Sequence, residues 1–152
     1  MILRRTVYAV QLLVPFVMPW IFFPGRLVLG APAGWLSGFG FLMLGPIMTI
    51  AMGLPVLLSL RDRTSYRARA AGRPYTLATL VLWGALLLSA VFVTEDEASP
   101  PASLLVVWTG GAIDVVTSQY LFFLSFVVVV GAWATAMWFA ITTLIDARRA
   151  AL

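Results

Sequence analysis

The sequence predicts an all-α membrane protein: a bundle of four transmembrane helices in a single domain of 152 residues. Hydrophobic residues make up 62% of the chain and charged residues only 11%, and the mean hydropathy is +1.00. Four stretches contain no Asp, Glu, Lys or Arg. Each is long enough for a helix to cross a hydrocarbon layer of ~30 Å, which takes roughly 18 to 25 residues. The predicted helices cover residues 6–23, 34–60, 75–94 and 119–145.

The first stretch, 6–23, resembles a signal peptide because Arg4 and Arg5 precede it and Ala31-Pro32-Ala33 follows it. The apolar run is longer than the usual ~7 to 15 residues of a signal peptide, and a proline interrupts the cleavage-like site. We therefore predict a retained helix. Pro15 and Pro19 remove backbone donors within it, so a kink is expected.

Small residues follow the faces of the second and fourth stretches. In lipid, helices associate through close backbone contact and hydrogen bonds, so such faces are expected to pack within the chain or against another subunit or a second copy. A second stripe on the fourth stretch consists of Ser125, Ala132, Ala136 and Thr143, and the third stretch offers Ala78, Ala85 and Ser89. The predicted packing or partner interface comprises Gly34, Gly38, Gly45 and Thr49 on the second stretch and Gly131, Thr135 and Thr142 on the fourth.

The connector 95–118 changes character along its length. Its first part is acidic and contains Pro100-Pro101, which predicts a non-helical, solvent-facing segment. Residues 103–108 are apolar but too short to span a membrane. Two interpretations stay open for 103–118: a short interfacial or re-entrant piece, or an outward extension of the fourth helix. Asp114 is a candidate partner for Arg26, the single basic residue predicted on this side.

Orientation follows from the ten arginines. Nine lie before the first stretch, in the loop 61–74 or after the fourth stretch, and the positive-inside rule places these segments and both termini in the cytoplasm. The connectors 24–33 and 95–118 are then external. We expect a cytoplasmic (plasma) membrane protein, and the absence of Lys and Asn is typical of a GC-rich bacterial genome. The loop arginines are predicted to contact anionic lipid headgroups rather than nucleic acid: Arg61, Arg63, Arg67, Arg69 and Arg73.

One candidate solute site lies inside the predicted bundle. Gln11 carries the only amide side chain within the four stretches apart from the boundary residue Gln119, and Pro15 and Pro46 leave backbone carbonyls that need new partners. Broken helices line binding sites in transporters. The predicted solute site therefore consists of Gln11, Pro15, Pro46 and Thr49; the alternative is that Gln11 is an interhelical tie.

Composition excludes several kinds of chemistry. The chain has no Cys, His or Lys, so thiol chemistry, the usual haem and zinc ligands, and Schiff-base catalysis are ruled out, and no cofactor is expected. The first-ranked function is a small accessory, assembly or scaffold subunit that packs against another membrane chain. The second is an oligomeric channel or transporter for a neutral or amphipathic solute. A lipid-modifying enzyme ranks last, because the acidic residues all lie at predicted helix boundaries and suggest no catalytic pair.

Overall fold

The computed structural model describes residues 2–61, 71–96, 98 and 101–149, and within these ranges all regular secondary structure is helical. Three helices are long and apolar enough to cross a membrane: Leu36–Arg61, Arg73–Phe92 and Val115–Ala147. A fourth span exists if the bent pair α1 (Ile2–Val10) and α2 (Val14–Phe22) counts as one. The fold is therefore a helical bundle compatible with a membrane-embedded protein.

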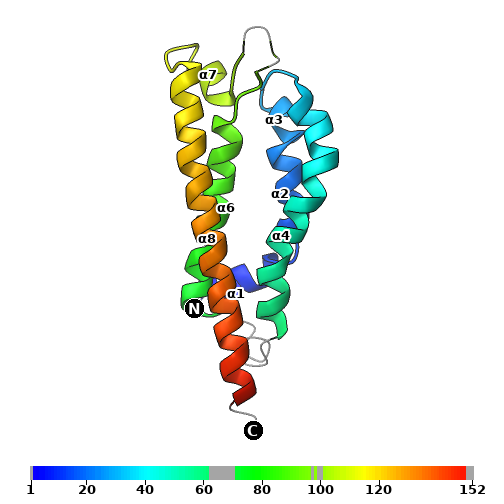
Figure 1. The fold of residues 1–152 in the computed structure, drawn as a ribbon, viewed down its shortest axis with the longest axis vertical. Coiled ribbons are helices and arrows are strands. Elements are labelled where there is room, and N and C mark those ends of the chain that lie inside the picture. Colours follow the sequence, from blue (N-terminus) through cyan, green and yellow to red (C-terminus); the bar gives the residue numbers. More distant parts are fainter. Residues whose placement is uncertain (1, 62–70, 97, 99–100, 150–152) are drawn as a thin grey trace.

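The helix predicted over 6–23 is broken into two, and the chain turns by 75° between α1 and α2. The break covers residues 11–13, directly before Pro15. Pro15 has no N–H to donate to the carbonyl of Gln11, and its ring crowds that carbonyl, so the helix cannot continue through this turn. The expected kink is thus a full change of direction, and α1 lies across the bundle while α2 runs along it (Figure 1).

The chain then reaches one end of the bundle and turns back. The short helix α3 (Gly25–Val28) is followed by a turn at Gly30, whose φ of 97° favours glycine. A π-helical turn, η1 (Leu36–Gly40), leads directly into α4 (Phe41–Arg61). α6 (Arg73–Phe92) begins with Pro74 in its first turn, where a missing N–H costs nothing.

Four helices form two side-by-side pairs, α2 with α4 and α6 with α8 (Val115–Arg149) (Figure 1). Small residues allow the second pair to approach closely. Ala85 of α6 and Ala132 of α8 belong to one buried cluster, and Ala78 and Ala136 belong to another. Ser89 and Ser125 add a buried hydrogen bond of 2.8 Å between the same helices.

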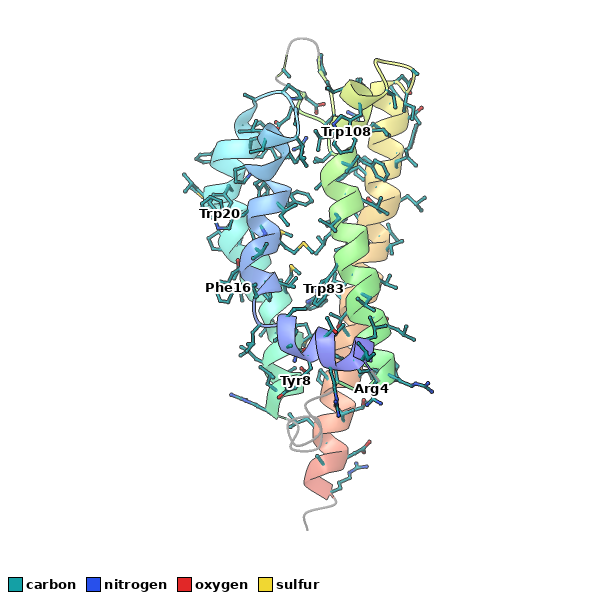
Figure 2. All side chains as sticks on the ribbon, turned by 180° about the vertical axis from the view of Figure 1, so that it is seen from behind. Arg4, Tyr8, Phe16, Trp20, Trp83 and Trp108 are labelled. Carbon is teal, nitrogen blue, oxygen red and sulfur yellow. The ribbon has the colours of Figure 1, made fainter. Side chains whose placement is uncertain are left out.

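Methionine side chains lie between the two pairs. Met18, Met48 and Met52 belong to one cluster with Leu82 and residues of α8, and Figure 2 shows sulfur atoms between the helix pairs. Unbranched thioether side chains adapt to irregular gaps, which suits two helix pairs that are not in uniform contact.

The connector after α6 forms a compact cap. Its apolar segment is a separate short helix, α7 (Leu104–Trp108), whose N-cap Ser103 accepts a bond from the N–H of Val106. Gly110 and Gly111 have positive φ and reverse the chain before α8 begins at Val115, four residues before the predicted start. The segment 103–118 is therefore divided: 104–108 is a separate short helix, and 115–118 extends the last one.

We call this end of the molecule, which carries α3, α7 and their connectors, the capped end. The opposite end, with α1 and the end of α8, is the terminal end (Figure 1). Trp108 ties the cap together, since its indole N–H donates to the carbonyl of Leu29 at 3.1 Å. Figure 2 shows Trp108 close to the top of the bundle.

Candidate functional site

An apolar pocket of about 590 Å³ lies between the two helix pairs. This volume is within the ~300 to 1,000 Å³ range of small-molecule sites. Every helix of the two pairs contributes to the wall, and the single hydroxyl side chain in it is Ser89, which already bonds to Ser125. The lining residues are Phe22, Phe23, Leu36, Leu44, Ile47, Met48, Ala51, Met52, Leu82, Leu86, Ser89, Val93, Phe122, Phe126, Val129, Val130 and Trp133.

The pocket opens sideways rather than toward either end. Its exposed lining residues lie on α4, with Ile47 62% exposed, and on α8, with Phe126 and Val130 each 50% exposed. Met52 and Leu82, which are buried, form part of the inner wall. The mouth therefore lies between α4 and α8, on a surface that would face lipid chains.

The pocket begins near the capped end and stops midway along the bundle. On α8 its lining residues run from Phe122 to Trp133, a distance of about 16 Å at 1.5 Å per residue. One leaflet of a bilayer has a hydrocarbon depth of about 15 Å, half of the ~30 Å layer. Along α8, the pocket therefore extends over about half the thickness of such a layer.

Trp133 forms part of the deep end, and a proline explains its position. Pro55 has no N–H to donate to the carbonyl four residues earlier, so the carbonyl of Ala51 lacks its helical partner. The indole N–H of Trp133 donates to this carbonyl at 2.7 Å. This bond gives the freed carbonyl a new partner and joins α4 to α8 where the pocket ends.

A buried ion pair lies next to the opposite end of the pocket. The guanidinium of Arg26 contacts the carboxylate of Glu95 at 3.3 Å, and both side chains are 0% exposed. Arg26 also donates to the carbonyl of Val93 at 2.7 Å, and the Ser37 hydroxyl donates to Glu95 at 2.9 Å. Burial lowers the pKa of Arg26, whereas attraction to Glu95 and the hydrogen bond to it raise it. The pair joins α3 to the end of α6.

Asp114, the partner proposed for Arg26, does not pair with it. Its carboxylate accepts a bond of 2.9 Å from the N–H of Thr117 and caps the start of α8. Hydrogen bonds from the Thr117 side chain and backbone lower the pKa of Asp114. Glu95 pairs with Arg26 instead. It lies three residues beyond the end of α6, and its N–H donates to the carbonyl of Ala102 across the connector at 2.9 Å.

Gly34 is required by this ion pair rather than by helix packing. A Cβ atom at position 34 would overlap the carboxylate of Glu95 and would lie 3.2 Å from the Cβ of Glu95. At Gly38, the other glycine of the same GxxxG sequence, a Cβ would meet nothing within 4 Å. The two glycines therefore have different roles although the sequence motif treats them alike.

We expect Gly34→Ala to lower the free energy of unfolding by about 1–3 kcal/mol, because the new methyl group must displace a buried, paired carboxylate. Gly38→Ala is the matched control and should be neutral or slightly stabilising, since alanine favours helix and the position is open. Thermal unfolding in a mild detergent measures both variants. Equal stability of the two would contradict the close approach of Gly34 and Glu95.

The predicted solute site is not assembled as one cluster. Gln11 is fully buried, and its carbonyl accepts bonds from Ser59 at 3.2 Å and Tyr75 at 3.1 Å. The residues predicted to join it lie elsewhere: Pro15 is buried in α2, Pro46 is exposed on α4, and Thr49 bonds to the carbonyl of Gly45 in its own helix. Gln11 ties α1 to α4 and α6, as in the alternative interpretation.

The predicted interface residues divide between the interior and the surface. Gly45 is buried near Phe41 and Pro19, so it serves packing within the chain. Gly131 and Thr135 are exposed on α8, and Thr142 is partly exposed. The other stripe of α8, which includes Ser125, Ala132 and Ala136, is buried against α6.

Of the five arginines predicted to contact headgroups, Arg61 and Arg73 are exposed at the terminal end, and Arg63, Arg67 and Arg69 lie outside the described residues. Arg4 lies at the same end (Figure 2), where its side chain donates to the carbonyl of Ala71 at 2.6 Å. Among the described residues, no group of three or more acidic side chains could hold a metal ion.

No protein family, curated protein sequence or solved structure matches this chain. The function is therefore inferred from the pocket and from the charged side chains at the capped end. Sequence reasoning missed the pocket, because its walls consist of ordinary apolar residues from four helices. The sequence did hold one signal: Pro55 indicates that the carbonyl of Ala51 needs a partner from another helix.

Proposed function

We propose that this chain is a small membrane protein that takes the hydrocarbon chain of an amphiphile from the bilayer and holds it between α4 and α8. The supporting observation is the apolar pocket of about 590 Å³ with its sideways mouth. The chain would then be one of the proteins that bind or transport an amphipathic solute. With both termini in the cytoplasm of a bacterial cell, as the arginines favour, the pocket would lie in the outer leaflet.

The chemistry of the wall favours a hydrocarbon chain. Among the described residues that form it, the only polar side chains are Ser89 and Trp133, and these are already hydrogen-bonded to Ser125 and to the carbonyl of Ala51. A flexible hydrocarbon chain can follow the pocket to its deep end at Trp133. Filling the space restores dispersion contacts that the lining side chains otherwise lack.

The test is photolabelling in lipid nanodiscs with an amphiphile that carries a diazirine in its alkyl chain. We expect label on pocket residues such as Met48 and Phe126, and excess unlabelled amphiphile should abolish it, because a site can be saturated. Phe123 and Leu124, which are exposed on α8 outside the pocket, should be labelled without saturation. Labelling that is unsaturable at every position would refute the proposal.

A second function, an accessory or scaffold subunit, is favoured by the exposed face of α8. Gly131 and Thr135 form a small-residue surface that no helix in the described part of the chain covers, and a Cβ at position 131 would meet nothing within 4 Å. Such surfaces admit a neighbouring helix in lipid. Recovery with a defined partner after gentle extraction would favour this function over the first.

A further inference from the structure

Three polar side chains form a hydrogen-bonded rim at the capped end. Thr94 donates to a carboxylate oxygen of Asp96 at 3.1 Å, and Gln119 donates to the same oxygen at 3.4 Å and to Thr94 at 3.4 Å. Asp96 is exposed, whereas Thr94 and Gln119 are half-buried. We call Thr94, Asp96 and Gln119 the polar rim.

The polar rim lies next to the outer end of the pocket along α6 and α8. Thr94 follows Val93, which lines the pocket, and Gln119 precedes the lining residue Phe122 by three residues, about 4.5 Å along the helix axis. The rim thus bridges α6 and α8 at the pocket's outer end. An amphiphile with its alkyl chain in the pocket would have its polar head group at the level of the polar rim.

The accessible charge at this level is negative. Asp96 and Asp114 are exposed, while the guanidinium of Arg26 is 0% exposed and engaged by Glu95. Since the one basic side chain at the capped end is neutralised and inaccessible, an anionic head would meet repulsion without a compensating contact. A cationic head would meet the carboxylate of Asp96.

We propose that the ligand is a cationic amphiphile, with its alkyl chain in the pocket and its ammonium group at Asp96. This inference rests on the proposed function and specifies its ligand class. The hydrogen bonds from Thr94 and Gln119 fix one oxygen of the carboxylate, so the group is positioned before the ligand arrives. The pocket favours ligands with an alkyl chain, and Asp96 favours those with a positively charged head group.

The experiment compares three diazirine amphiphiles of equal chain length with trimethylammonium, neutral sugar and sulfate heads. Saturable labelling of Phe126 is measured for each in nanodiscs of zwitterionic lipid. We expect the cationic probe to reach half-saturation at a concentration about fivefold lower than the neutral probe. This ratio is at the upper end of what an exposed ion pair contributes. The anionic probe should bind most weakly.

Asp96→Asn should abolish this preference, because the amide retains the size and acceptor atom of the carboxylate but loses its charge. Asp114→Asn is the matched control, since asparagine also caps helices well. Asp114 is farther from the pocket than the polar rim, because it precedes the lining residue Phe122 by about 12 Å along the axis of α8. This substitution removes one charge from the same end and should preserve the preference.

Equal half-saturation for all three heads, or tighter binding of the sulfate probe, would overturn the inference about Asp96 while leaving the proposed pocket intact. A preference that Asp114→Asn removes as fully as Asp96→Asn would also overturn it, because the cause would then be the general charge of the capped end. Absence of saturable labelling with every probe would instead refute the proposed function.

Discussion

Replacing Arg26 with methionine is expected to lower the free energy of unfolding by about 3–5 kcal/mol, the cost of removing one partner of a buried ion pair. Methionine keeps much of the length of the side chain but leaves the carboxylate of Glu95 buried without a counter-charge. It also leaves the carbonyl of Val93 without its donor at 2.7 Å. Both losses loosen the attachment of α3 to the end of α6.

Thermal or denaturant unfolding in a mild detergent measures this effect. Arg73→Met is the matched control, because Arg73 is exposed at the terminal end and should change stability by no more than about 0.5 kcal/mol. The double variant Arg26→Met with Glu95→Gln should recover part of the loss, since no unpaired charge remains. If Arg26→Met were as mild as Arg73→Met, the ion pair would not be buried as the structure describes.

Blocking the pocket mouth is expected to produce the largest effect on binding. Val130 lines the mouth on α8 and is 50% exposed, so Val130→Trp places an indole across the opening with little strain on the buried core. Because the indole occupies the space of the alkyl chain, half-saturation of the photolabel should require at least a tenfold higher concentration, about 1.4 kcal/mol of binding free energy.

Val127→Trp is the control for this substitution. Val127 lies on the same helix, is 67% exposed and does not line the pocket, so the added indole should leave labelling of Phe126 unchanged. Similar unfolding temperatures for the two variants would show that both are folded. Equal binding by both would mean that the amphiphile does not enter between α4 and α8.

Much of the helical framework follows from local features of the sequence. The stretches without charged residues at 34–60, 75–94 and 119–145 correspond to helices Leu36–Arg61, Arg73–Phe92 and Val115–Arg149. The expected kink near Pro15 also occurs, because the loss of a backbone donor acts within one turn. Its angle of 75° was not predictable, since it depends on where α1 finds contacts with the rest of the bundle.

The candidate site was predicted less well, and Gln11 shows why. Its amide was correctly identified as an unusual polar group within an apolar stretch, but its partners Ser59 and Tyr75 are 48 and 64 positions away. Many polar side chains on four helices could have met it. The choice depends on helix rotation and height, which small differences in side-chain packing decide.

By itself, the sequence determined which segments are long apolar helices, where prolines break the backbone pattern and which connecting and terminal segments are basic. These properties depend on each segment's composition and on neighbours within a turn or two. Only the tertiary structure decided that Glu95 rather than Asp114 meets Arg26, that Trp133 bonds to Ala51 across 82 positions, and that a pocket separates the helix pairs. The physical reason is that the apolar surfaces of different helices resemble one another in sequence. Which surfaces have complementary shapes is decided only when the helices pack.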